Sequence, residues 1–390
     1  MSSELKGVFL LLVRLGIGNV NVDDNDNLDL GFWSGVDWEA VKSLAERQGL
    51  SGVVADGIVC LPKEVRPPKL VMLQLIGEVL QNYEYRHELY RRAIAELAGF
   101  YNSHGFKMMV LKGYACAMDW PKPEHRPSGD IDIWLFGEQK EADAALLNLN
   151  DNANDNLGSS EGSKSEKTRI EIDNSHHHHT VFYWRDFMVE NHYDFINVHH
   201  HRSNAVFERI LKKLGADDSH SVELYGERVY LPSPDLHALF LLKHMMLHFA
   251  SGELSLRQVL DWAFFVKTHG SEVDWKYVTG VLEEFGMRKL SGIFNAICGE
   301  ELGFEFSGLK AYGLPLTDVD KALKERVVNE ILSPEFEGET PSALIPRIVF
   351  KYRRWKANGW KHRLCYRESM WSAFWSGVWN HLLKPGSILR

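Results

Sequence analysis

The chain has 390 residues, of which 45% are hydrophobic and 25% charged, and its formal net charge is −9 at pH 7. This length favours two or three domains or subdomains, and the composition is that of a soluble globular protein. A protein that binds nucleic acid along its whole surface is basic throughout. The acidic balance excludes that class, and we expect no nucleic-acid partner.

The cysteines are widely scattered and form no Cys-x-x-Cys pair: Cys60, Cys116, Cys298 and Cys365. Their spacing argues against a disulfide framework or a cysteine zinc site and suits a reducing cytosol. The apolar run at residues 8–13 is far shorter than the ~20 residues that a membrane span needs, and no small-residue cleavage site follows it. We therefore expect a cytoplasmic protein whose first helix is buried.

Residues 1–102 predict an N-terminal helical subdomain. Apolar residues recur at helical spacing in Trp38–Ala45, and residues 69–102 contain few helix breakers. The second stretch predicts one or two long amphipathic helices, which His104-Gly105 would end. No motif here carries chemistry, so this part is expected to be a scaffold or a lid.

Residues 103–205 predict a small α/β core. Phe106–Leu111 is expected to be a short buried strand, followed by a Lys112-Gly113 turn and a short helix at Tyr114–Met118. A strand, a glycine turn and a helix N-terminus favour phosphate, because backbone N–H groups and the helix dipole both attract anions. Many strands end in Lys-Gly at a surface turn, so this run alone specifies nothing.

The run from Arg126 to Leu135 predicts the next strand. Asp130, Asp132 and Trp134 share one of its faces, and the apolar residues between them point into a core. Two carboxylates on one face can share hard cations such as Mg²⁺, which prefer oxygen ligands. An isolated Asp-x-Asp strand is more often a solvated sheet edge, so this interpretation depends on the neighbouring runs.

Residues 138–147 predict a helix, and residues 148–167 are almost wholly polar or glycine. That second stretch cannot bury enough apolar surface to order itself, so we expect a disordered insertion within the core. Strand patterns resume beyond it in three runs: Arg169–Asp173, His179–Tyr183 and Phe187–His192. In the last run, Glu190 and His192 lie on one face together with Met188.

From residue 206 the pattern is helical to the end of the printed chain, which predicts a C-terminal helical domain at 206–390. The expected helices include Leu236–Phe249, Leu256–Val266, 317–332 and 342–356. The whole chain therefore predicts an α+β fold, in which a small mixed-sheet core is flanked by N-terminal helices and a C-terminal helical domain.

The Asp-x-Asp strand, the Lys-Gly turn and a third acid on a later strand together favour metal-assisted phosphoryl or nucleotidyl transfer. Two Mg²⁺ ions about 3.5–4 Å apart can clamp the attacking and leaving oxygens of such a reaction. We expect Asp130 and Asp132 to bind both ions and Glu190 to be the third acid, with Asp194 as its substitute. The residues expected at the phosphates of a nucleotide are Lys112, Gly113, Arg126, Ser128 and Gly129.

Three runs resemble one known family: Val110–Gly113, Arg126–Asp132 and Val189–Tyr193. They are similar to the bacterial uncharacterised nucleotidyltransferase family of the polymerase-beta-like nucleotidyltransferase superfamily. That family has a strand ending Leu-Lys-Gly, an Arg-Pro-x-Gly-Asp-Ile-Asp strand and a Val-Glu-x-His strand. The resemblance covers roughly residues 30–290.

The resemblance implies a nucleotidyltransferase-like core in residues 103–205 and a metal triad of Asp130, Asp132 and Glu190. It also implies that Gly113 with Lys112 lies near the phosphates of the nucleotide. One departure concerns the third-acid strand, where the family has an apolar residue and this chain has Asn191. The acceptors of the family are largely undefined, so the resemblance supplies no acceptor.

Histidines and one arginine are further candidates. His176–His179 precede a strand near His192, and alternate histidines on a strand could form a transition-metal site or line the polar edge of the sheet. His244 lies four residues before His248 on a predicted helix, where core packing is the commoner role. Arg257 and Asp261 have the spacing of a helix-surface ion pair. The residues that we assign to the acceptor side are His192, Asp194, His244 and Arg257.

Residues 341–390 hold ten Lys or Arg residues against one acid, Glu368, so this segment is +9 and the rest of the chain is −18. The basic residues interleave with Tyr and Trp, a mixture that suits an anionic membrane surface or a nucleic acid. A terminal helix that packs its aromatic face on the protein body is the alternative. We retain peripheral membrane contact through residues 345–390 as a hypothesis.

The function favoured by these patterns is a cytoplasmic nucleotidyltransferase that uses Mg²⁺ or Mn²⁺. It would move a nucleoside monophosphate from a nucleoside triphosphate to an acceptor, such as a small molecule, glycan or protein, and release pyrophosphate. Two alternatives stay open: a catalytically inactive binding or regulatory module with the same fold, and a membrane-associated component of glycan assembly.

Overall fold

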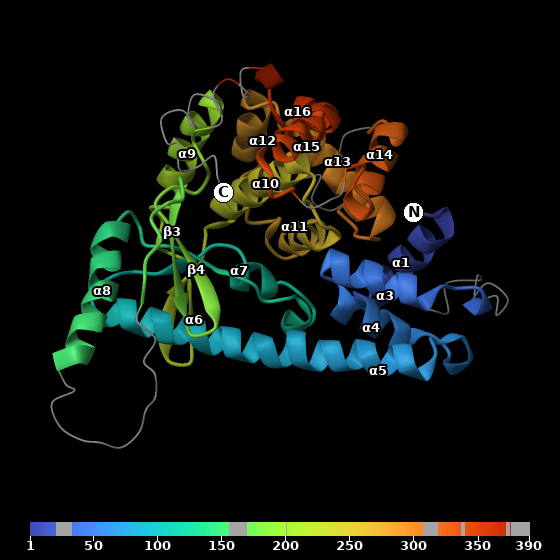
Figure 1. Cartoon of the computed structure of the whole chain (residues 1–390), viewed down its shortest axis with the longest axis horizontal. Helices are drawn as coiled ribbons and strands as arrows, with labels where there is room; N and C mark the ends of the chain where they lie inside the picture. The colour runs from blue at the N-terminus through green and yellow to red at the C-terminus, as the bar shows by residue number, and fades with distance from the viewer. Residues whose placement is uncertain are drawn as a thin grey trace. The chain divides into compact units, whose positions relative to one another are not determined.

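The computed structural model describes residues 1–20, 33–155, 170–199, 201–306, 319–336, 340–371 and 375. Within it, the chain forms two compact units (Figure 1). The helical unit is drawn from Met1–Arg86, Asp119–Pro127 and Ala238–Arg390, and the sheet unit from His87–Met118 and Ser128–His237. Both units are therefore assembled from segments that alternate along the chain.

The sheet unit contains one six-stranded sheet with the strand order β3-β4-β2-β1-β6-β5. Its strands are β1 (Met109–Val110), β2 (Ile131–Trp134), β3 (His179–Trp184), β4 (Phe187–His192), β5 (Ser221–Leu224) and β6 (Glu227–Tyr230). The pairs β2–β4 and β1–β6 are parallel, and the other three pairs are antiparallel. The expected α+β class with a small mixed sheet is confirmed.

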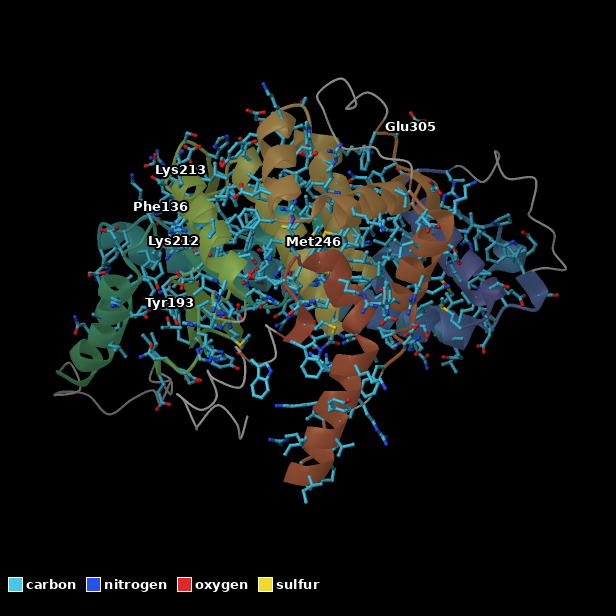
Figure 2. All side chains as sticks on the ribbon, turned by 90° about the horizontal axis from the view of Figure 1, so that it is seen from above. Phe136, Tyr193, Lys212, Lys213, Met246 and Glu305 are labelled. Atoms are coloured by element: carbon cyan, nitrogen blue, oxygen red, sulfur yellow. The ribbon has the colours of Figure 1, made fainter. Side chains whose placement is uncertain are left out.

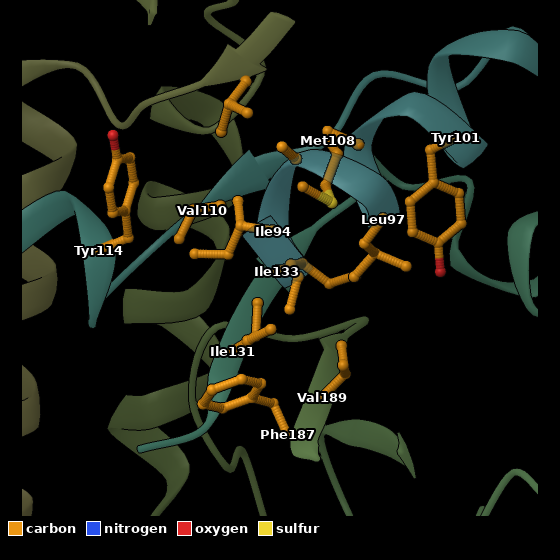
Figure 3. Close-up of a cluster of buried hydrophobic side chains, with 14 of the residues drawn as sticks. Ile94, Leu97, Tyr101, Met108, Val110, Tyr114, Ile131, Ile133, Phe187 and Val189 are labelled. Carbon is orange, nitrogen blue, oxygen red and sulfur yellow. The ribbon is translucent and has the colours of Figure 1, made fainter. Parts of the chain in front are cut away.

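The α-helices of the sheet unit are α6 (Arg86–Ser103), α7 (Tyr114–Ala117), α8 (Gln139–Asp155) and α9 (Arg202–Leu214). Helices α6, α7 and α8 contribute buried side chains to the hydrophobic cluster on the apolar face of the sheet. Figure 3 shows Ile94 and Leu97 of α6 against Ile131 and Ile133 of β2, and all four side chains are fully buried. Each such side chain contributes about 1.5–3 kcal/mol when it leaves water. The period-2 pattern of β2 thus has the predicted orientation, with its apolar residues in the core.

Three features of this unit differ from the sequence-based expectation. Helix α8 extends to Asp155, into the segment 148–167 that we expected to be disordered; Leu149 packs against the core, and helical hydrogen bonding propagates cooperatively beyond such a contact. Residues 156–169 lie outside the described residues. Of the run Arg169–Asp173, the described part contains only an isolated bridge, from Asp173 to Val181.

The third difference is the hairpin β5–β6, in a part of the chain that we expected to be helical throughout. Its two strands are four residues each, joined by Tyr225-Gly226, where both residues have positive φ (50° and 86°). Two consecutive positive φ angles make a hairpin turn whose twist matches the flanking strands. The alternation in such short strands gives little periodic signal, which explains the wrong expectation.

The helical unit holds the remaining helices. Its N-terminal part has α1 (Ser3–Gly16), α3 (Trp38–Gln48), α4 (Ser51–Cys60) and α5 (Lys69–Glu78), and the π-helical turn η3 (Val79–Tyr85) continues α5 into α6. Its C-terminal part has α10 (Pro234–Ser251), α11 (Leu256–His269), α12 (Trp275–Glu284), α13 (Arg288–Ala296), α14 (Lys321–Leu332), α15 (Leu344–Ala357) and α16 (Gly359–Cys365).

Helix α1 is buried, as expected: Val8, Phe9 and Leu12 are at most 1% exposed. Among the described helices, none combines the length and the apolar character that crossing a membrane requires. The continuous helix from residue 69 to residue 103 confirms the expectation of long helices there, and Gly105 with φ 84° follows its end.

Candidate functional site

The candidate site lies on the polar face of β2 and β4 in the sheet unit. These strands are parallel neighbours, and their register pairs Asp132 with Glu190 and Trp134 with His192. Residues paired in register point to the same face of a sheet. Side chains separated by 58 positions in the sequence are therefore neighbours, because the apolar residues of both strands face the core and fix the register.

Asp132 is the centre of the site, and its carboxylate binds two cationic side chains. Lys112 Nζ lies 2.7 Å from Asp132 Oδ1, and His192 Nε2 lies 3.1 Å from the same oxygen. His192 Nε2 is also 3.5 Å from Glu190 Oε2. Asp132 is 1% exposed and His192 is 2% exposed, so these contacts are shielded from water.

The charges of these groups follow from their contacts. Burial would raise the pKa of Asp132, but Lys112 and His192 hold it well below its usual range. Burial would lower the pKa of His192, but its contacts with Asp132 and Glu190 raise it to about 9. Burial acts in the same direction on Lys112, whose pKa is nevertheless raised by the charges of Asp132 and Asp130. At neutral pH Asp132 is therefore anionic, and both partners are cationic.

Asp130 occupies the position before β2. The charge of Asp132 raises the pKa of the Asp130 carboxyl, and burial adds to this effect. Its backbone carbonyl accepts a hydrogen bond of 2.8 Å from the Tyr90 hydroxyl on α6. Gly113 lies against this contact with φ 57°, and a Cβ there would meet Tyr90 Oη at 2.3 Å. Only glycine fits this position of the turn after β1 without displacing Tyr90.

The side chains present fit a divalent cation. The donor atoms of Asp132, Glu190 and His192 lie within 4.8 Å of one another, and two of the three residues offer carboxylate oxygens. The raised pKa of Asp130 shows that negative charge is concentrated beside Asp132, and a bound cation would relieve this repulsion. Lys112 and His192 supply the balancing charge in this structure.

Histidines from the start of β3 extend the site. His179 pairs with His192 in the β3–β4 register, and its Nε2 lies 3.8 Å from Glu190 Oε1. Burial lowers the pKa of His178 to about 2 and that of His179 to about 4. From the sequence, these histidines were expected to form a transition-metal site or to line the polar edge of the sheet. The β3–β4 hairpin register is what brings His179 to the carboxylates.

Two of the residues expected at the phosphates differ in their surroundings. Ser128 is buried, and its Oγ lies 3.5 Å from His87 Nδ1. Gly129 is exposed, and a Cβ there would have no atom within 4 Å among the described residues. Asn191, where the family pattern has an apolar residue, is buried and donates a hydrogen bond of 2.8 Å to Asp143 of α8.

Arg126 belongs to the helical unit and forms a bidentate pair with Asp261 of α11. Arg126 Nε lies 2.7 Å from Asp261 Oδ1, and Nη2 lies 2.9 Å from Oδ2. Trp120 Nε1 donates to the same carboxylate at 2.9 Å. Both charged residues are about 4% exposed. The structure therefore gives Arg126 a buried partner within its own unit.

The residues assigned to the acceptor side lie in both units. In the sheet unit, His192 is part of the site itself, and Asp194 forms an ion pair with Lys212 of α9, which is labelled in Figure 2. In the helical unit, His244 Nε2 lies 3.0 Å from His248 Nε2 on α10, and Arg257 Nη1 lies 3.6 Å from Asp261 Oδ2. The structure thus brings His192 to the carboxylates and gives the other three local partners.

Acids on neighbouring strands of a small mixed sheet, with a lysine at the end of the adjoining strand, suit chemistry on phosphates. The comparison with protein families defines the class as that of the nucleotidyltransferases: a family model described as an uncharacterised nucleotidyltransferase matches residues 34–303. This match spans more than half of the chain, so the chain belongs to the uncharacterised nucleotidyltransferase family.

The matched range confirms the resemblance expected over residues 30–290 and contains all the candidate site residues. Searches of curated proteins and of solved structures gave no match. Placement in the polymerase-beta-like superfamily and a bacterial origin stay predictions.

Proposed function

We propose that this protein is a nucleotidyltransferase that uses Mg²⁺ or Mn²⁺ and transfers a nucleoside monophosphate from a nucleoside triphosphate to an acceptor. The observation that carries the proposal is the pairing of Asp132 with Glu190 on adjacent parallel strands. Asp130 belongs to the same group of charges, because the charge of Asp132 raises its pKa. Family membership supports nucleotidyl transfer as the general role. The reducing environment suggested by the cysteines makes the cytoplasm the proposed location.

In this proposal Asp130, Asp132 and Glu190 hold the metal ions. Divalent cations bound there supply charge stabilisation at the phosphates and lower the pKa of a bound hydroxyl. An oxygen of the acceptor forms a bond to the α-phosphorus, the bond from that phosphorus to the bridging oxygen breaks, and pyrophosphate leaves. Glu190, which is partly exposed at 17%, is placed to take the proton of the acceptor hydroxyl.

Lys112 is the residue that we assign to the phosphates. It now neutralises Asp132, and a cation bound by the carboxylates would take over that role. The ammonium group would then be free to bind a phosphate oxygen as a point charge. The turn at Gly113 and the exposed Gly129 are the proposed backbone surfaces beside the triphosphate.

The test is transfer of label from each α-labelled nucleoside triphosphate, in the presence of Mg²⁺ or Mn²⁺ and a cell extract that supplies acceptors. We expect the wild-type protein to transfer label and an Asp130→Asn/Asp132→Asn variant to lose at least a hundredfold in rate. A matched control, Asp186→Asn/Glu223→Gln, removes two exposed carboxylates from the same unit and should retain the wild-type rate. Equal transfer by wild type and the site variant would contradict the proposal.

The alternative is a catalytically inactive module that binds nucleotide with the same fold. Binding of a non-hydrolysable triphosphate, measured by calorimetry, separates the two. Binding without transfer in any extract or with any metal favours the inactive module. Transfer that depends on Asp130 and Asp132 favours the enzyme.

A second proposal concerns α15 and the segment that follows it. On α15, Ile345, Ile348 and Tyr352 are 74%, 58% and 55% exposed and lie at helical spacing on one face. Trp371 is 60% exposed. The net charge of +9 over residues 341–390 complements anionic lipid headgroups. We propose that this surface contacts an anionic membrane peripherally, as a glycan-assembly role would require.

Co-sedimentation with vesicles tests the membrane proposal. We expect binding to vesicles that contain anionic phospholipid, weaker binding to purely zwitterionic vesicles, and loss of binding in an Ile345→Ser/Ile348→Ser/Tyr352→Ser variant. Leu70→Ser/Leu73→Ser/Leu80→Ser is a matched control, because these apolar side chains on α5 and η3 are 65%, 58% and 53% exposed. If the control variant loses binding equally, or if wild type binds neither vesicle, the α15 surface is not a membrane contact.

A further inference from the structure

Three histidines converge beside the carboxylate site, at the end of the β3–β4 hairpin. His179 and His192 are paired in the register, and the carbonyl oxygen of His178 accepts hydrogen bonds from the backbone N–H groups of Tyr193 and Asp194. The hairpin ladder therefore fixes the backbone of both histidine-bearing strands. The potential ligand atoms of His178, His179 and His192 all lie within 4.8 Å of one another.

Two ring nitrogens of this cluster are candidates to donate an electron pair to a metal ion. Nδ1 of His178 and Nδ1 of His179 are buried, and within the described part of the chain they have no hydrogen-bond partner. A buried polar atom without a partner costs about 1–3 kcal/mol. A bound water or ion is a common partner for such atoms.

His192 has the orientation of a metal-binding imidazole. Its Nδ1 lies 3.2 Å from the backbone oxygen of Asp194. A carbonyl oxygen can only accept, so Nδ1 carries a hydrogen, and Nε2 is the ring nitrogen beside the carboxylates of Asp132 and Glu190. A hydrogen bond from the distal ring nitrogen to a carbonyl is the usual support of a metal-ligating histidine.

We propose that His178, His179 and His192 bind one transition-metal ion of the Zn²⁺ class, at a site that adjoins the carboxylate site. Imidazole nitrogen suits Zn²⁺, Co²⁺, Ni²⁺ and Cu²⁺, whereas Mg²⁺ prefers oxygen. Glu190 is our candidate for a carboxylate fourth ligand, since its Oε1 lies 3.8 Å from His179 Nε2 and its Oε2 lies 3.5 Å from His192 Nε2.

The geometry needs only a small adjustment. Nitrogens around a tetrahedral zinc ion with bonds of 2.0–2.1 Å lie about 3.3–3.5 Å apart, so the rings must approach by roughly an ångström or more from a separation of up to 4.8 Å. Rotation about side-chain torsions can supply this shift while the ladder stays in place. Binding would release the proton of His192 Nε2 and withdraw this nitrogen from Asp132, and the two cation sites would then be coupled through one shared residue.

The test uses the purified full chain without nucleotide and Co²⁺ as the spectroscopic probe. A tetrahedral Co²⁺ site has strong visible absorption, so titration should give an intense visible band that saturates at one Co²⁺ per chain. We expect His178→Ala and His179→Ala each to weaken Co²⁺ binding at least tenfold, and excess Zn²⁺ to abolish the band. His220→Ala, in the same unit but outside the cluster, should bind like wild type.

One further variant and one further measurement serve as controls. Asp130→Asn should retain the Co²⁺ band, which would separate this site from the carboxylate site and from the proposed transfer reaction. Thermal melting of each histidine variant checks that it is folded. Weak octahedral absorption in wild type, or unchanged Co²⁺ affinity in folded His178→Ala and His179→Ala, would overturn the proposal and leave a cluster that only lines the sheet edge.

Discussion

Lys112 Nζ and Asp132 Oδ1 lie 2.7 Å apart, and Asp132 is 1% exposed. This ion pair joins the end of β1 to the middle of β2 and places a lysine where a cation would otherwise balance the carboxylates. Removing one partner of a buried pair leaves an uncompensated charge, which is strongly destabilising. The pair therefore links the stability of the sheet unit to the occupancy of the proposed metal site.

Replacement of Lys112 by Met should lower the free energy of unfolding by an amount on the order of 3 kcal/mol without divalent cations. Mg²⁺ or Mn²⁺ should raise the melting temperature of this variant more than that of wild type, because the cation replaces the missing positive charge. Lys107→Met is the control: Lys107 pairs with Asp218 in an exposed contact, so its loss should change stability far less than the loss of Lys112. An equal metal effect on all three proteins would contradict the assignment of Asp132 as a metal ligand.

Replacement of Arg126 by Met should destabilise the helical unit by about 3–5 kcal/mol, because it leaves Asp261 buried without its bidentate partner. Urea unfolding measures this change. The double variant Arg126→Met/Asp261→Asn should cost less than the sum of the single variants, since the two residues share one interaction. Arg92→Met, in an exposed pair with Glu88, is the control and should change stability far less than Arg126→Met.

The Arg126 variant also separates two roles. If Arg126 mainly binds nucleotide, Arg126→Met should unfold like wild type and lose affinity for a non-hydrolysable triphosphate. Sequence reasoning placed Arg126 at the nucleotide because it directly precedes Pro127 and the acid strand. The structure adds its pairing with Asp261, 135 positions away in the sequence.

The face of a strand on which each site residue lies has a local physical cause. The orientation of Asp132 was predictable, because apolar residues alternate with it and a strand has period 2. The same alternation selected Glu190 and His192. Local periodicity shows which face of a strand a residue occupies, and hydrophobic burial of the other face makes that prediction reliable.

Partners that depend on tertiary register were not predictable in the same way. The pairing of His179 with His192 depends on the β3–β4 ladder. That of Asp132 with Glu190 depends on two parallel strands that α8 and β3 separate in the chain. The hydrogen bond from Tyr90 to Asp130 comes from a helix that the sequence marked as free of chemistry. No local pattern encodes these contacts, since each joins elements whose spacing is set by packing.

Replacement of Gly113 by Ala should destabilise the sheet unit by about 1–3 kcal/mol, because a Cβ would meet Tyr90 Oη at 2.3 Å and φ is 57°. Gly129→Ala is the matched control, since a Cβ there meets no described atom within 4 Å. Adding Tyr90→Phe to Gly113→Ala should restore part of the loss by removing the clashing oxygen. Thermal melting of wild type and the three variants checks this order, and equal melting of Gly113→Ala and Gly129→Ala would contradict it.

Glu208 of α9 should make stability depend on pH. Its carboxylate accepts hydrogen bonds from the backbone N–H groups of Phe195 and Ile196, at 2.9 and 3.1 Å. Burial nevertheless raises the pKa of Glu208 from its ordinary value of 4.5 to about 7. Between these two values the folded chain binds more protons than the unfolded chain, so stability must fall as pH rises.

The contribution of Glu208 is therefore complete below about pH 4.5 and is lost as pH rises through about 7. The slope cannot exceed about 1.4 kcal/mol per pH unit for one group. Urea unfolding from pH 5 to pH 8 should show a shallower decline in Glu208→Gln than in wild type, because glutamine does not titrate. Glu223→Gln, an exposed acid on β5, should follow the wild-type profile. Parallel profiles of stability against pH for wild type and Glu208→Gln would contradict the prediction that burial raises the pKa of Glu208.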